Sequence, residues 1–171
     1  AVIALGALVS AQADEAENEK LAKEVKNALS TFKAKDSSFE QTLKKVHGYV
    51  IFPRIAKGGL IIGGAGGAGE VYEGGKLIGR AKLSQGTIGA QIGGQVFSEV
   101  ILFENEGALS RFKQSRLEMS AQVSAVAAAE GVAQNAKFSG GVAVITMPVS
   151  GLMAEASVGG QKLDFIPLEA K

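Results

Sequence analysis

The sequence predicts an α+β protein in which an antiparallel, glycine-rich curved sheet or barrel is covered by two or three helices. Before residue 48, apolar residues recur at helical spacing. After residue 69, they mostly recur at every second position, in short runs separated by Gly, Pro and Asn. No long helical segment interrupts these runs, which argues against a parallel α/β sheet.

The length and composition are those of one globular domain. The chain has 171 residues, of which 46% are apolar, enough for a substantial core. Its 23 glycines indicate tight turns and close contacts between strands. The net charge of +1 gives no reason to expect a nucleic acid partner. With no cysteine and a single histidine, the chain has no disulfide and no ligand set for a zinc site.

Residues 1–13 differ in character from the rest of the chain. The apolar run Ala1–Val9 is too short to span a bilayer, and Ala11 and Ala13 form an A-x-A pattern. We interpret residues 1–13 as the remnant of a secretory signal or a flexible tail, and residues 14–171 as a single domain. This predicts an extracytoplasmic location, in the periplasm or cell envelope, with any lipid anchor upstream of Ala1. The alternative is an apolar segment packed into the core.

Two helices are predicted before the first strand. The first begins near Asp14, in a cluster of acidic residues, and its apolar stripe runs from Leu21 to Phe32. The second begins at Ser37, which has the capping-box spacing with Glu40. Gly48 is expected to end it as a C′ glycine.

The most unusual stretch follows, with a strand from Tyr49 to Phe52 that Pro53 is expected to stop. Seven glycines lie between Gly58 and Gly69, and some of them match the dinucleotide fingerprint G-x-G-x-x-G by letters.

That fingerprint requires a helix to begin at the glycine loop, so that its N-terminus can hold a pyrophosphate. The residues after Gly69 instead predict a strand and a hairpin closed by Gly74 and Gly75. We therefore expect Gly64 to Gly69 to be a loop between strands, without a nucleotide site. Gly66→Val is expected to destabilise the domain rather than to remove a ligand.

The remaining elements are mostly strands. Asn105 has the character of an N-cap for a short helix that contains Ala108, Leu109 and Phe112. Residues Ala125 to Asn135 are ambiguous, because their alanines favour a helix within a strand-rich region. The predicted strands run from Thr87 to Ile92, Gln95 to Phe103, Leu117 to Ala125, Val142 to Met147, Leu152 to Val158 and Lys162 to Ile166.

No catalytic constellation is visible in the sequence. His47 is the only imidazole, and its place in the last turn of a helix is explained by the helix dipole. We therefore predict a protein that is not an enzyme, with neither a cofactor nor a metal.

The segment from Lys33 to Lys57 is basic, with six Lys and Arg residues against two acidic ones. Cations beside aromatic residues suit anionic head groups at a membrane surface. Because Gly48 and Pro53 both interrupt regular structure, we expect the chain to fold back and bring these cations to one edge. The alternative is a solvated, charged surface without a ligand.

These motifs together resemble the SYLF domain family. The resemblance rests on Tyr49-Val-Ile-Phe-Pro53, on Lys57-Gly58-Gly59, on the run from Ser84 to Gln95 and on Gly151 to Val158, and it covers roughly Leu21 to Phe165. Eukaryotic members of that family bind phosphoinositides, and bacterial members are commonly secreted or lipid-anchored. In one departure, residues Ala127 to Gln134 lack the proline and arginine of a turn that is usual in the family.

The resemblance implies a lipid-binding module that recognises anionic phospholipid or phosphoinositide-type head groups. The rival hypothesis is a structural module of the envelope that binds a protein partner and has no specific lipid ligand. The residues predicted to meet the lipid supply cations, with one aromatic anchor: Lys44, Lys45, His47, Phe52, Arg54, Lys57, Arg80 and Lys82.

Overall fold

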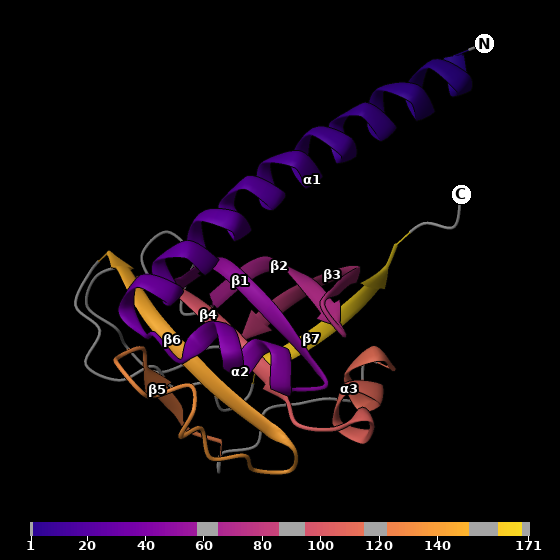
Figure 1. Ribbon diagram of the computed structural model, residues 1–171. Helices are drawn as coiled ribbons and strands as arrows, with labels where there is room; N and C mark the ends of the chain where they lie inside the picture. Colours follow the sequence, from indigo (N-terminus) through magenta and orange to yellow (C-terminus); the bar gives the residue numbers. More distant parts are fainter. Residues whose placement is uncertain (1, 58–64, 86–94, 115–122, 151–160, 169–171) are drawn as a thin grey trace.

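The computed structural model describes residues 2–57, 65–85, 95–114, 123–150 and 161–168 (Figure 1). Three helices and seven strands follow one another in these segments: α1 (Val2–Lys35), α2 (Phe39–Lys45), β1 (Gly48–Lys57), β2 (Ala65–Glu73), β3 (Lys76–Gln85), β4 (Gln95–Phe103), α3 (Glu106–Lys113), β5 (Ala125–Ala127), β6 (Val142–Ser150) and β7 (Gln161–Pro167). The α+β class predicted from the sequence is confirmed. The strands predicted at 87–92 and 152–158, and most of the one at 117–125, lie outside the described residues.

The strands form one curved sheet in the order β5-β6-β4-β1-β2-β3-β7. All neighbouring strands pair antiparallel except β5 and β6, which are parallel. In the part of the chain that the structure describes, β5 and β7 are the two edges, so the sheet is open and the barrel alternative is wrong. The central strand β1 hydrogen-bonds to β4 on one side and to β2 on the other. It therefore joins the two halves of the sheet.

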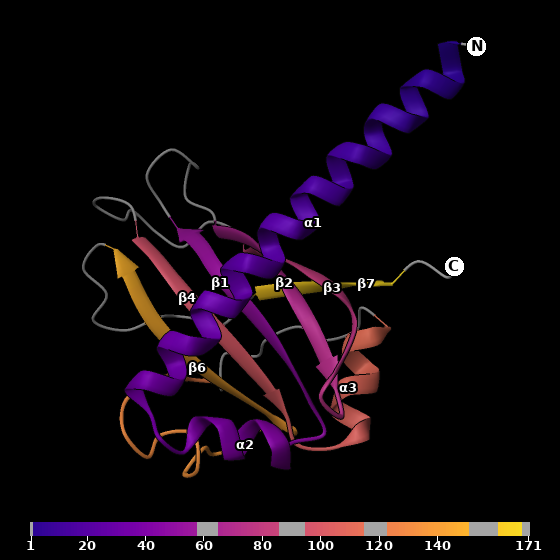
Figure 2. The ribbon, with the colours of Figure 1, turned by 45° about the horizontal axis from the view of Figure 1, so that its top comes forward.

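Helices cover both faces of the sheet, because successive side chains of its buried strands point to opposite faces. Val50 and Phe52 of β1 belong to the core beneath α3, whereas Tyr49 and Ile51 belong to the core beneath α1 and α2. Figures 1 and 2 show this arrangement, with α1 crossing one face of the sheet and α3 lying on the other. The molecule is thus built in three layers, with two cores separated by the sheet.

Helix α1 is longer than the sequence predicted. Its predicted stripe is present, and Val25, Ala28 and Phe32 are buried against the sheet. The helix begins at Val2 rather than near Asp14, so the acidic cluster lies within the helix and not at its positive end. Its N-terminal part extends beyond the sheet (Figure 2). Among the described residues, no helix has both the length and the hydropathy needed to cross a membrane.

Deleting residues 1–13 is expected to leave the thermal unfolding temperature of the domain unchanged. The backbone of residues 2–13 extends α1 away from the sheet, whereas the packed stripe lies further along the helix. Circular dichroism melting of the two forms checks this. A fall of several degrees in the shortened form would show that this run stabilises the domain, and the interpretation as a signal remnant would lose its main support.

The corner between α1 and α2 is built around Asp36 rather than the predicted capping box. Helix α2 has Ser38 as its N-cap, and the Ser38 hydroxyl makes no capping hydrogen bond to the helix. Both the backbone N–H and the hydroxyl of Ser38 donate to the Asp36 carboxylate. The same carboxylate accepts hydrogen bonds from the backbone N–H groups of Gly131 and Ala133. Asp36 therefore joins this corner to a segment almost 100 residues away.

Two expectations about the start and course of β1 are wrong. Gly48 does not follow α2 as a C′ residue: the helix ends at Lys45, Val46 is its C-cap, and Gly48 opens the strand. Pro53 does not stop the strand either, since β1 continues to Lys57. The pairing register with β4 shifts between Phe52 and Ile55, and at this irregularity the missing N–H of a proline can be accommodated.

The hairpin prediction is confirmed, and the predicted glycine loop is partly wrong. Gly74 and Gly75 join β2 to β3 with φ angles of 59° and 81°, as a type I′ turn requires. Most of the run from Gly64 to Gly69 lies in β2 rather than in a loop. Because a strand and not a helix contains these glycines, the described chain has no helix N-terminus there that could hold a pyrophosphate.

Candidate functional site

The structure does not bring the predicted cations to one edge. Lys44 and Lys45 lie exposed at the end of α2, next to the start of β1. Arg54 and Lys57 lie toward the opposite end of the same strand. A strand of this length extends about 30 Å, so the expectation that the chain folds back at Pro53 is wrong.

The other predicted residues also separate. Phe52 is fully buried in the core beneath α3 and exposes no apolar surface to a membrane, so its predicted role as an anchor is wrong. The cause is the central place of β1, whose side chains are covered on both faces. Arg80 and Lys82 lie along β3, where their backbone partners in β2 are Glu70 and Ala68. They are several residues away from the hairpin that meets α2.

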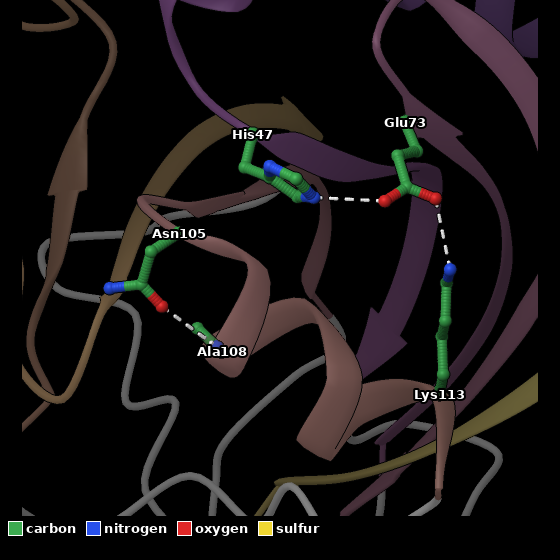
Figure 3. Close-up of polar contacts among 5 residues, drawn as sticks. All are labelled: His47, Glu73, Asn105, Ala108 and Lys113. Atoms are coloured by element: carbon green, nitrogen blue, oxygen red, sulfur yellow. Dashed lines mark hydrogen bonds and ion pairs between the residues drawn. The ribbon is translucent and has the colours of Figure 1, made fainter.

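His47 belongs to a small ionic cluster between three elements (Figure 3). Its Nε2 lies 2.9 Å from Oε2 of Glu73, and Lys113 Nζ donates to Oε1 of the same carboxylate at 2.9 Å. The hydrogen bond from Lys113, helped by the one from His47, holds the pKa of Glu73 below its usual value despite partial desolvation. Asn105 stands nearby as the N-cap of α3, with its Oδ1 accepting from the Ala108 N–H, as predicted.

The cluster connects the start of β1, the end of β2 and the last turn of α3. Glu73 lies between His47 and Lys113 and contacts both, so each of these side chains has a partner within the protein. His47 is therefore a partner of Glu73 in this structure. Its predicted contact with a phosphate stays a prediction that the geometry does not favour.

A different group of cations does come together around α2. Lys33 at the end of α1 and Lys44 at the end of α2 line one surface hollow of about 320 Å³, together with Gly74 and Gly75 of the hairpin turn. Two further lysines lie next to these residues in the chain: Lys45, which follows Lys44 and lines a second hollow, and Lys76, which follows Gly75. We call these four residues the lysine face: Lys33, Lys44, Lys45 and Lys76.

All four lysines of the lysine face are exposed. Lys33 lies 3.8 Å from a carboxylate oxygen of Glu40. The other three form no ion pair with the described residues. The hollow is also lined by the apolar residues Leu43, Val46 and Tyr49 and by Glu40. Exposed lysines that lie close together give this face a positive local charge.

Sequence reasoning found half of the lysine face. It assigned Lys44 and Lys45, counted Lys33 only as part of a basic segment and overlooked Lys76. The signal for Lys76 was its position directly after the predicted Gly-Gly turn, which places it at the tip of a hairpin. The sequence pattern does not show which helix end this tip would meet, because that depends on the order of the strands in the sheet.

The site has the chemistry of a binding surface. In the part of the chain that the structure describes, no three His, Cys, Asp or Glu side chains converge as they would around a metal ion. The only histidine is held by Glu73. The fold and the exposed lysines thus define a small α+β binding domain.

Comparison with known proteins supports the resemblance found in the sequence. Residues 84–165 match the family model Ysc84, described as "Las17-binding protein actin regulator". The chain is also 29% identical over 156 residues to Beta cell expansion factor A of Aeromonas veronii. That match covers 85% of this chain and 59% of the relative, so the chain spans about three fifths of the length of the curated relative it matches.

The resemblance found in the sequence is thereby confirmed, since residues 84–165 match the Ysc84 model, which describes the SYLF domain, and the relative is a SYLF-family protein. This is a family of binding modules, for lipids or proteins, rather than one of enzymes.

Proposed function

We propose that this chain is a non-catalytic module that binds the surface of anionic phospholipid membranes through its lysine face. The observation that supports this most directly is the hollow between α1, α2 and the β2–β3 turn, where Lys33 and Lys44 lie together. Similarity to the SYLF family supports lipid binding as one of its general functions.

The expected affinity is modest and depends on salt. Each lysine near an anionic membrane contributes about 1 kcal/mol, and three of the four lysines have no competing ion pair with described residues. Binding through exposed cations is screened by salt within about 10 Å at 0.1 M. We therefore propose recognition of a negatively charged surface, of phospholipid or phosphoinositide type, rather than of one particular head group.

Flotation with liposomes tests this proposal. The chain is expected to float with vesicles that contain phosphatidylglycerol, to stay behind with neutral phosphatidylcholine vesicles, and to be released by a few hundred millimolar salt (roughly where the Debye length approaches 5 Å). The variant Lys44→Glu/Lys45→Glu/Lys76→Glu is expected to lose flotation and to remain folded, since all three side chains are exposed.

A matched control separates the lysine face from general charge. The variant Arg54→Glu/Lys82→Glu/Lys162→Glu changes the net charge by the same amount, at exposed positions away from α2. It is expected to float nearly as well as the unchanged protein. Equal losses in both variants, or no loss in the first, would contradict the lysine face as the binding site.

A protein partner is the second candidate function. The description of the matching family names a protein that binds Las17 and regulates actin, so protein recognition occurs in this family. The open edges of the sheet offer a route, because β5 is only three residues long and leaves much of the β6 edge unpaired among the described strands. A chain that fails to float with any lipid composition would favour this function.

We also propose the extracytoplasmic location that residues 1–13 predict. Fractionation of cells that make the protein from its natural gene checks this expectation. Recovery with cytoplasmic markers would contradict it.

A further inference from the structure

A second surface hollow lies at the β5 edge of the sheet, away from the hairpin turn that borders the lysine face. It has a volume of about 480 Å³ and is enclosed by β5, the first half of β6 and the segment from Val132 to Ser139. Hollows of several hundred Å³ are typical of sites for small molecules. Its size and shape arise because β5 pairs with only three residues of β6, from Val144 to Thr146.

The walls of this hollow are mostly aliphatic and aromatic. Val126 and Phe138 both line it, and β6 contributes its buried valines and Ile145. The exposed fraction of Val126 is 51%, which is high for a residue of this type. A polar rim consists of Ser124, Asn135, Lys137 and Ser139.

The charge of the rim is of one sign. Among the described residues, Lys137 is the only charged one that lines the hollow. It is exposed and forms no ion pair with any described residue. An apolar cavity with one unpaired cation at its mouth is complementary to a molecule with an apolar body and one negative charge at its end.

We propose that this hollow binds the alkyl chain of an anionic single-chain amphiphile, with its acidic head at Lys137. This site goes beyond the binding of a membrane surface through the lysine face and does not depend on it. The apolar walls remove the alkyl chain from water, and the single lysine sets its direction. A linear chain suits the hollow because the walls offer few hydrogen-bonding groups for a polar body.

Dodecanoate, used below its micelle concentration, is the probe, with dodecanol as its uncharged analogue. Isothermal titration is expected to give saturable binding of dodecanoate with one site per chain, and weaker binding of dodecanol. Because each buried methylene contributes a constant free energy, affinity is expected to rise about fourfold per carbon from octanoate to dodecanoate. Binding that does not saturate, or that does not depend on chain length, would overturn the proposal.

Variants locate the site. Val126→Trp fills the hollow from an exposed position and is expected to weaken dodecanoate about tenfold or more. Val149→Trp is the matched control, since Val149 is 52% exposed and does not line this hollow. Lys137→Glu is expected to weaken dodecanoate about tenfold and to leave dodecanol unchanged. Equal affinities of Val126→Trp and Val149→Trp for dodecanoate would place binding elsewhere and overturn the proposal.

The two binding surfaces are separable in the same experiments. The variant Lys44→Glu/Lys45→Glu/Lys76→Glu is expected to keep its affinity for dodecanoate even where it loses flotation with liposomes. A protein that floats with anionic liposomes and shows no saturable dodecanoate binding would overturn this inference alone, and would leave the hollow as a site for an apolar protein segment.

Discussion

Replacing Gly69 by alanine is expected to lower the free energy of unfolding by about 3 kcal/mol. Gly69 lies in β2, directly against the central strand β1. A Cβ at this position would lie 2.5 Å from the carbonyl oxygen of Ile51 and 2.8 Å from the Phe52 ring. The carbonyl belongs to the backbone of a strand paired on both sides, and Phe52 is fully buried, so neither neighbour can move cheaply.

The matched control is Gly66→Ala, three residues earlier in the same strand. A Cβ on Gly66 would have its nearest neighbour, the carbonyl oxygen of Leu83, at 3.6 Å, an ordinary contact. An alanine there also lowers the conformational entropy of the unfolded chain. Gly66→Ala is therefore expected to be neutral or to stabilise slightly. The glycine whose substitution destabilises the domain most is therefore expected to be Gly69, and not Gly66 as the sequence suggested.

Urea unfolding of the three proteins measures these effects through the transition midpoint at constant slope. Equal stabilities of Gly69→Ala and Gly66→Ala would contradict the close approach of β1 to β2. That approach makes glycine necessary where β1 changes register between Ile51 and Ala56. This geometry is a structural explanation for the glycines that match a nucleotide fingerprint by letters.

Local patterns predicted local structure well. The apolar strand from Gln95 to Phe103, the Gly74-Gly75 turn and the Asn105 cap are all confirmed, because each depends on residues close together in the chain. The fold class and the resemblance to the SYLF family followed from such elements taken together.

The wrong predictions concern positions whose structure depends on contacts with segments far away in the chain. Pro53 signals the end of a strand, yet β1 continues past it because two partners hold the strand on either side of a register shift. That single difference separates Arg54 from Lys44 and so divides the predicted basic patch. Burial of Phe52 has the same origin, since the sequence shows an apolar run but not which neighbours cover it.

Asp36 has a structural role that the sequence pattern did not reveal. It was one acid in a count of charges, yet its exposed fraction is only 2%. Desolvation raises the pKa of Asp36, but hydrogen bonds from the Ser38 hydroxyl and from the backbone N–H groups of Ala133, Gly131 and Ser38 outweigh it and hold the pKa below the ordinary value. Its partners in the 131–133 segment lie 95 and 97 residues away in the chain.

Asp36→Asn is expected to lower the free energy of unfolding at pH 7 by about 2–3 kcal/mol. Oδ1 of Asp36 accepts from Ser38 and from the Gly131 N–H, and Oδ2 accepts from the Ala133 N–H at 2.8 Å. An asparagine that keeps its oxygen at Oδ1 turns its NH₂ group toward the Ala133 N–H, so two donors face each other in a buried place.

Glu130→Gln is the matched control, because Glu130 accepts hydrogen bonds from Ser37 of the same corner at an exposed position. Its effect is expected to be within about 0.5 kcal/mol.

The pH dependence of stability tests separately whether the negative charge of Asp36 stabilises the protein. Because the pKa of Asp36 is lower in the folded protein than in the unfolded chain, the carboxylate adds stability that is fully present above the unfolded value of 3.8. This stability is lost as the pH falls through the folded pKa. Urea unfolding at pH 7, 5 and 3 (about one unit either side of the unfolded pKa at the lower two) is therefore expected to show an equal gap between the unchanged protein and Asp36→Asn at pH 7 and 5. The gap is expected to narrow at pH 3. A gap that stays constant down to pH 3 would show that the shape of the side chain, and not its charge, holds the corner together.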